Sequence, residues 1–290
     1  MFGKLFRKNK KQNDIMSNYP VTVPLSESSV VLNINEDIVK IGCEQSQGKR
    51  HYQEDSYGFS DISDTSGLNK RGLLAVVADG MGGLKNGREI SARLAGEFIK
   101  RFAGLEHIEN FSEIIPEMVC QINNYLCGMY CEGDRIVSGS TLVAVNITKG
   151  TLFHVAVGDS RIYLIRQKRL YQITEDDDYL NQLLEGVIAH NLTLMEAKND
   201  VQKDKLAKCI GDPTLSEGEI ECGIRGLKLY PDDMIVMCSD GLYNALDDNE
   251  IIESVNGDPQ ISAETLVRKA LAKNYQYQDN ISVITISYNN

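Results

Sequence analysis

The chain has 290 residues, of which 42% are hydrophobic and 24% are charged, the balance of a globular protein rather than a disordered one. Its 30 basic and 41 acidic residues give a formal net charge of −11, which argues against nucleic acid as a main partner. No apolar run approaches the roughly 18 residues of a membrane span, and an odd count of seven cysteines suits a reducing compartment. We therefore expect a cytoplasmic protein.

Residues 1–35 are predicted to form a flexible tail, because they are polar, contain Pro20 and Pro24 and show no sustained period. Within them, residues 1–11 carry five bases and no acid beside four large apolar side chains. The favoured interpretation is a solubilising arm, and the alternative is a short anchor to an anionic membrane surface. Residues 36–290 contain no linker rich in Pro, Gly or Ser, so we predict a single domain there.

The predicted elements of this domain come in an irregular order. Runs rich in Val and Ile predict strands, and apolar residues three and four apart predict helices. In chain order these are strands Ile38–Cys43 and Leu73–Ala78, helices Gly87–Phe102 and Phe111–Cys131, strands Thr141–Ile147, Thr151–Val157, Arg161–Ile165 and Met234–Cys238, helices Asp247–Ser254 and Ala263–Lys273, and strand Ile281–Tyr288. Pairs of strands broken by pairs of helices favour a layered α+β domain with largely antiparallel sheets.

Carboxylates stand where the predicted strands end. They are Glu54, Asp55, Asp79, Asp159, Asp240 and Asp279. A single Asp-Gly, such as Asp79-Gly80, is more often a turn or a helix cap than a functional site. Several carboxylates at strand ends are different, because charges that converge beside an apolar core repel one another unless cations balance them. Oxygen ligands of this kind select Mg²⁺, Mn²⁺ or Ca²⁺, so we predict a site for divalent cations.

Six short motifs, five of which contain these carboxylates, resemble in order those of the metal-dependent Ser/Thr protein phosphatases of the protein phosphatase 2C type, bacterial branch. They are Arg50-His51-Tyr52-Gln53-Glu54-Asp55, Val77-Ala78-Asp79-Gly80-Met81-Gly82-Gly83, Ser138-Gly139-Ser140-Thr141, Val157-Gly158-Asp159-Ser160-Arg161, Cys238-Ser239-Asp240-Gly241-Leu242 and Asp279-Asn280-Ile281-Ser282. Each motif alone is weak, but six in sequence form a specific signal. The resemblance implies an α/β/β/α sandwich, in which helices flank two mostly antiparallel sheets and a metal cleft lies at one edge.

The resemblance also implies a role for each carboxylate. Asp79 would bridge two Mn²⁺ or Mg²⁺ ions, and Gly80 would offer its main-chain carbonyl to one of them. Asp240 and Asp279 would hold the other ion. Asp55 would bind a metal directly or orient water on it. These residues together would form the metal centre.

Three further residues have supporting roles by the same resemblance. Arg50 would grip the phosphate of the substrate, since its planar fork matches phosphate geometry. Glu54 would stand beside Asp55 at the metal centre, and Asp159 would support the site or hold a third, looser metal. A hydroxide bridging the two metals would attack phosphorus in line, without a phosphoenzyme intermediate. Some family members have a histidine where Met81 stands, and methionine cannot donate a proton, so the leaving-group acid stays open.

The predicted function is hydrolysis of phosphoserine and phosphothreonine in proteins, in opposition to a Ser/Thr kinase of the same cell. The expected partners are a phosphorylated protein, which is the substrate, and a cognate kinase or its targets. Residues 178–225 correspond to the family's mobile flap beside the cleft, which would influence the choice of substrate. The alternative is a catalytically silent module that binds phosphoproteins or acts as a scaffold on the same fold. Such modules lose metal ligands, and this chain keeps Asp55, Asp79, Asp240 and Asp279.

Overall fold

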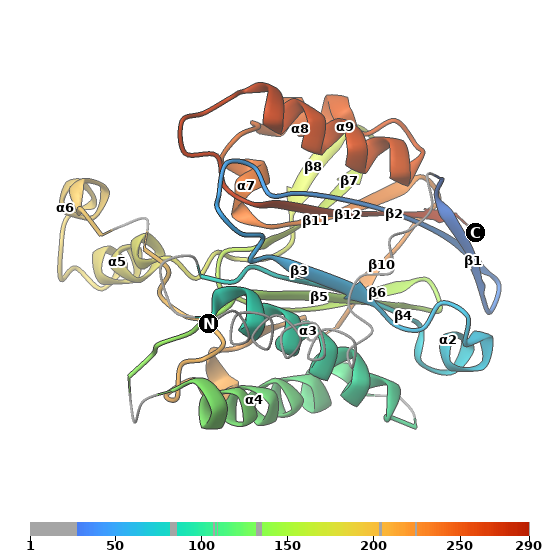
Figure 1. Cartoon of the computed structure of the whole chain (residues 1–290), viewed down its shortest axis with the longest axis horizontal. Helices are drawn as coiled ribbons and strands as arrows, with labels where there is room; N and C mark the ends of the chain where they lie inside the picture. Colours follow the sequence, from blue (N-terminus) through green and yellow to red (C-terminus); the bar gives the residue numbers. More distant parts are fainter. Residues whose placement is uncertain are drawn as a thin grey trace, which may run out of the picture.

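The computed structural model of the chain describes residues 28–81, 86–106, 108, 110–131, 135–202, 205–223 and 225–289. Two six-stranded sheets lie face to face, and helices cover the outer face of each (Figure 1). The predicted α+β sandwich is thus confirmed. Within the described residues, no helix is long and apolar enough to cross a membrane.

The first sheet has the strand order β1-β2-β12-β11-β7-β8. Its strands are β1 (Val30–Ile34), β2 (Asp37–Ser46), β12 (Ile281–Asn289), β11 (Asp233–Cys238), β7 (Arg161–Arg166) and β8 (Arg169–Gln172). All of these pairings are antiparallel. The strand that comes last in the sequence, β12, therefore lies in the middle of this sheet, between β2 and β11.

The second sheet has the order β10-β6-β5-β4-β3, with β9 paired to β6. Its strands are β10 (Leu227–Lys228), β6 (Thr151–Val157), β5 (Leu142–Thr148), β4 (Leu73–Ala78), β3 (Ser56–Phe59) and β9 (Glu221–Cys222). These pairings are antiparallel as well. Both sheets are therefore antiparallel, as the sequence predicted.

Strand β4 shows why these apolar runs form central strands. All six of its residues are buried. Leu73, Ala75 and Val77 belong to the core between the two sheets. Leu74 and Val76, one residue out of phase, pack against the helices instead. Because successive side chains of a strand point to opposite faces, only a continuous apolar run can be buried on both sides.

The helices form the two outer layers. Helices α3 (Gly87–Ala103) and α4 (Phe111–Tyr130) pack on the second sheet through an apolar cluster. Helices α7 (Asp240–Tyr243), α8 (Asp248–Ser254) and α9 (Pro259–Ala272) pack on the first sheet. The predicted apolar face of α3, which includes Leu94 and Phe98, is fully buried.

Other elements differ from the prediction. Strand β1 lies inside the range predicted as a tail, so the ordered fold begins before residue 36. The tail prediction is wrong for residues 30–34, because a strand of five residues is too short to show a sustained period. The remainder of the predicted tail, residues 1–27, lies outside the described residues. The predicted flap range contains α5 (Tyr179–Ile188), α6 (Leu194–Asn199) and the 3-10 turn η1 (Glu217–Glu219), and α5 and α6 project from the body in Figure 1.

Candidate metal and phosphate site

The carboxylates that the sequence singled out gather at one end of the sandwich. Pairing of β3 with β4 sets Ser56 opposite Ala78, which brings Asp55 beside Asp79. Pairing of β11 with β12 sets Cys238 opposite Val283. Asp240 follows the end of β11 and Asp279 precedes the start of β12, so these two acids lie at neighbouring strand ends. Strand β7 begins opposite Cys238 as well, and Asp159 stands just before it. The strand ends of both sheets thus meet, at the end of the molecule where α7 begins (Figure 1).

Asp55 ties the two sheets together at this end. Its Oδ2 accepts hydrogen bonds from the hydroxyls of Ser239 and Ser282, both at 2.8 Å. Ser239 precedes Asp240 and Ser282 lies in β12, so one buried carboxylate fixes the ends of two strands. Its other oxygen, Oδ1, is buried and has no hydrogen-bond partner. The sequence prediction missed both serines, although each stands in a motif that contains a predicted ligand.

Asp79 and Gly80 are held by the motif that contains Thr141. The amide of Asp79 donates to the Thr141 hydroxyl at 3.0 Å, and its carbonyl accepts from the Thr141 amide at 2.8 Å. Gly80 lies opposite Ser140 in an isolated antiparallel bridge, and its own amide donates to the carbonyl of Glu54 at 3.2 Å. A side chain at Gly80 has no room, because a Cβ there would lie 2.3 Å from the carbonyl oxygen of Gly87. Glycine at position 80 therefore allows the main chain of Gly87 to pack closely against it.

Burial and like charges raise the pKa of the clustered acids. Loss of hydration raises the pKa of Asp55 to about 6 and the pKa of Asp240 to about 7. Burial first, and then the charges of Asp55, Asp240, Asp159 and Asp279, raise the pKa of Asp79 well above its ordinary value. Burial also raises the pKa of Asp159. These effects require proximity, so the five carboxylates share one electrostatic environment that favours bound protons or bound cations.

Arg50 forms an ion pair with one acid of this cluster. Its guanidinium donates to Asp279 Oδ2 at 2.5 Å, and the charges of Asp279, Asp240 and Asp79 help to raise its pKa. The side chain of Arg50 is 44% exposed. The side chain is therefore open to solvent, where it can meet an anionic group. Burial also raises the pKa of Glu54, which lies beside Arg50.

The donor set fits divalent cations in its chemistry. Oδ1 of Asp55 and Oδ1 of Asp240 are buried carboxylate oxygens without a hydrogen-bond partner. Carboxylate oxygens are the ligands that Mg²⁺ and Mn²⁺ prefer. In the side-chain positions of the described residues, however, no three His, Cys, Asp or Glu groups are close enough to hold a metal ion. The assignment of individual ligands therefore stays a prediction.

Met81, which stands where some family members have a histidine, lies beside this site. Its amide donates to the carbonyl of Gly139 at 3.0 Å. Its terminal methyl group covers Gly139, where a Cβ would lie 1.7 Å from it. The side chain thus packs on the glycine and supplies no proton. Gly82 and Gly83 of the same motif lie outside the described residues.

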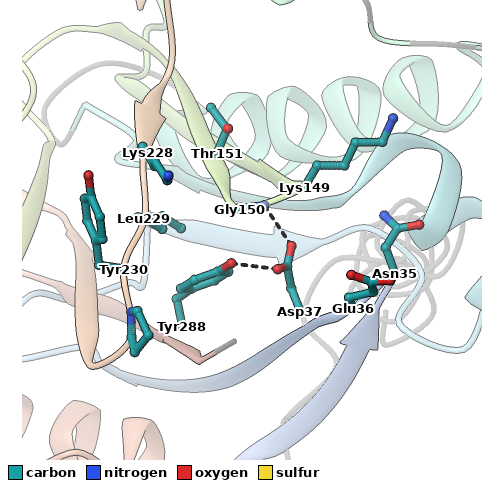
Figure 2. Close-up of a pocket in the computed structure, with 11 residues that line it drawn as sticks. Asn35, Glu36, Asp37, Lys149, Gly150, Thr151, Lys228, Leu229, Tyr230 and Tyr288 are labelled. Atoms are coloured by element: carbon teal, nitrogen blue, oxygen red, sulfur yellow. Dashed lines mark hydrogen bonds between the residues drawn. The ribbon is translucent and has the colours of Figure 1, made fainter.

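Two cavities are lined by residues other than the predicted ligands. One, of about 620 Å³, is lined by acids near the flap, and two of these are in ion pairs, Asp176 with Arg161 and Asp177 with Lys208. The other, of about 770 Å³, lies where β2 and β11 begin and β12 ends, at the opposite end of the sandwich (Figure 2). There the buried Asp37 carboxylate accepts hydrogen bonds from the Tyr288 hydroxyl and the Gly150 amide. Neither cavity contains a predicted ligand.

A two-sheet sandwich with a carboxylate cluster at one end is the architecture of the metal-dependent phosphatases. Comparison with known proteins agrees with this class. The family model described as protein phosphatase 2C matches residues 47–273. The chain therefore belongs to the protein phosphatase 2C family, and it is a metal-dependent Ser/Thr protein phosphatase.

Individual relatives resemble the chain over most of its length. Serine/threonine phosphatase stp of Listeria welshimeri is 28% identical over 245 residues, which are 83% of this chain and 92% of that protein. The S. agalactiae serine/threonine phosphatase superposes with a TM-score of 0.72 at 25% identity, covering 86% of this chain and 99% of that one. The catalytic domain of the phosphatase PstP, solved with two manganese ions, shares the fold with a TM-score of 0.67 at 24% identity, over 88% and 100% of the two chains.

Proposed function

We propose that Asp55, Asp79, Asp240 and Asp279, with the main-chain carbonyl of Gly80, hold two Mn²⁺ or Mg²⁺ ions. The observation that carries this proposal is the pair of buried carboxylate oxygens, one on Asp55 and one on Asp240, that have no partner. Such oxygens are costly in a folded protein unless a proton or a cation satisfies them. When bound, the two cations would lower the pKa of a water molecule and neutralise charge on the phosphoryl group.

In the same proposal Arg50 binds the phosphate of a phosphoserine or phosphothreonine side chain. Its pairing with Asp279 uses one nitrogen and holds the guanidinium at the edge of the cluster. The remaining N–H groups can donate to phosphate oxygens, and a charge-assisted pair of this kind is strong. Binding the phosphate here orients the phosphorus toward the carboxylate cluster and neutralises developing charge.

Two more acids would support the centre. Glu54 is anchored by its amide, which donates to Asn280 Oδ1 at 2.8 Å, and this bond joins the loop before β3 to the loop before β12. The carbonyl of Asp159 accepts from the Tyr243 hydroxyl at 2.9 Å, so its backbone is fixed beside α7. We infer that Glu54 orients groups at the metals and that Asp159 supports the site or holds a third, looser ion.

The enzyme would oppose a Ser/Thr kinase in the cytoplasm and act on the phosphoproteins that the kinase produces. The alternative for residues 1–11, contact with an anionic membrane surface, is a second proposal, which deletion of those residues and binding to anionic vesicles can test. Unchanged vesicle binding after the deletion would reject it. The scaffold alternative is distinguished by catalysis, since a silent module would bind a phosphopeptide without releasing phosphate.

The central test compares wild-type protein with Asp240→Asn and with Asp248→Asn. Asp248 is an exposed acid in the first turn of α8, so its variant is a control for the loss of one charge. Titration calorimetry should show two Mn²⁺ sites in the wild type and in Asp248→Asn, and fewer or much weaker sites in Asp240→Asn. Release of phosphate from a phosphothreonine peptide should follow the same order. Equal manganese binding by all three proteins would refute the ligand assignment.

A further inference from the structure

Two loops form one lip of the carboxylate cluster. One comprises residues 47–55 before β3, and the other comprises residues 274–280 before β12; they are the blue and dark red loops near α7 in Figure 1. The amide of Lys49 donates to the carbonyl of Gln278 at 2.9 Å. The ammonium of Lys49 donates to the carbonyls of Asn274, at 3.2 Å, and Tyr275, at 2.6 Å. We call this pair of loops the lip.

The lip is fixed by hydrogen bonds to its main chain and by close packing of its two loops. The side-chain amide of Asn280 donates to the carbonyls of Gln47, at 2.9 Å, and Tyr52, at 3.0 Å. Gly48 has a φ of +57°, and a Cβ on it would lie 2.1 Å from the carbonyl oxygen of Asp279. The two loops therefore touch through their backbones, which fixes the main chain from which the exposed side chains of the lip extend.

Three tyrosines of the lip are uncovered. The exposed fractions are 69% for Tyr52, 48% for Tyr275 and 86% for Tyr277. Only three other tyrosines of the described residues are exposed in this way, on α4, on β8 and in the loop after β10. Single exposed aromatic residues are common, but several on one rigid surface are typical of protein interfaces.

The tyrosines adjoin the position proposed for the phosphate. Tyr52 lies two residues after Arg50, and Tyr277 lies two residues before Asp279, the partner of Arg50. Two residues span at most about 7 Å of extended chain. A polypeptide with its phosphate on Arg50 would therefore have its neighbouring residues within reach of both rings. A small phosphate ester would be too short to contact them.

We propose that Tyr52 and Tyr277 form a subsite for the residues that flank the phosphorylated side chain of a protein substrate. Their rings would pack on apolar side chains and on the extended main chain of that segment. This inference rests on the proposed function, because it assumes that Arg50 binds the phosphate. It adds a contact that serves polypeptide substrates and leaves the chemistry at the carboxylates unchanged.

The test uses two substrates with the same leaving group. One is a decapeptide with a central phosphothreonine and apolar neighbours, and the other is the single blocked residue N-acetyl-phosphothreonine amide. We expect Tyr52→Ala and Tyr277→Ala each to lower kcat/KM for the decapeptide about fivefold, through KM, in line with the effect of truncating an interface aromatic. Hydrolysis of the single residue should change by less than about twofold, since the substrate does not reach the rings.

Two controls make the outcome decisive. Tyr125, 41% exposed on α4, serves as a matched tyrosine away from the lip, and Tyr125→Ala should leave both substrates unaffected. Tyr277→Phe keeps the ring and should retain the wild-type KM. An equal loss on both substrates, or no loss on the decapeptide, would overturn the subsite. If Arg50→Ala hydrolyses the single residue as well as the wild type does, the proposed phosphate ligand is wrong, whatever the tyrosines do.

Discussion

Substitution of Asp240 by asparagine should stabilise the metal-free enzyme while it abolishes activity. Oδ1 of Asp240 is buried without a partner, and its surroundings raise its pKa to about 7. A carboxyl group with a raised pKa holds its proton more tightly in the folded state than in the unfolded state. The folded protein therefore loses stability as the pH rises from the ordinary pKa through about 7. Asparagine has nearly the same shape and no charge to lose.

The size of this stability difference follows from the shift in the pKa of Asp240. A pKa of about 7 against an ordinary value of 3.8 is a difference of roughly three units, or about 4 kcal/mol above pH 7 at 1.36 kcal/mol per unit. Because the neighbouring acids share this repulsion, we expect the single substitution to raise the free energy of unfolding of the metal-free protein by about 2–4 kcal/mol. Below the ordinary pKa Asp240 is protonated in both states, so the advantage of the variant should vanish there.

Denaturant titration with a chelator present, at pH 4 and pH 8, measures this difference directly. We expect Asp240→Asn to be more stable than the wild type at pH 8 and to lie within about 1 kcal/mol of it at pH 4. Added Mn²⁺ should raise the stability of the wild type far more than that of the variant, because the ion binds only the native ligands. A variant that is less stable than the metal-free wild type at pH 8 would contradict the proposed strain among the carboxylates.

Three further predictions concern packing, a distant buried acid and the metal. Gly42→Ala should lower the free energy of unfolding by about 3 kcal/mol or more, because its Cβ would lie 2.3 Å from the main chain of Gln260 in α9. Gly128→Ala, in open space on α4, should raise it by about 1 kcal/mol, and denaturant titration measures both changes. Tyr288→Phe removes a hydroxyl bonded to the buried Asp37 and should cost about 2 kcal/mol without changing kcat, since it lies at the far end of the sandwich. Chelation of divalent cations should abolish release of phosphate from a phosphothreonine peptide, and Mn²⁺ should restore it; turnover that persists in the chelator would exclude metal-dependent catalysis.

The sequence predicted the central strands well because these are buried on both faces. Strand β4, for example, has the predicted bounds, and its six residues are all buried. The shorter elements were missed for physical reasons. Strands β9 and β10 have two residues each, too few to show a period. Helices α5 and α6 lie away from the core and leave apolar side chains such as Ile188 and Met195 exposed, so their pattern does not mark a buried face.

Within the candidate site, the sequence predicted the acids but not what holds them. A carboxylate at the end of an apolar run is visible in the sequence because its position is unusual. The bonds from Ser239 and Ser282 to Asp55 cross 184 and 227 residues of chain, and they exist only after the two sheets have met. Serine in a motif carries no sign of its partner. The arrangement of the acids therefore had to come from the fold.

The central place of β12 has a consequence for biosynthesis. This strand follows every other described strand in the sequence, yet it pairs with β2 and β11 on its two sides and begins beside Asp279. While a ribosome is still translating residues before 279, the first sheet is split and the acidic pocket is incomplete. We therefore expect a nascent chain that lacks β12 to be unable to remove phosphate from its neighbours, with catalysis beginning once the closing strand has emerged and inserted.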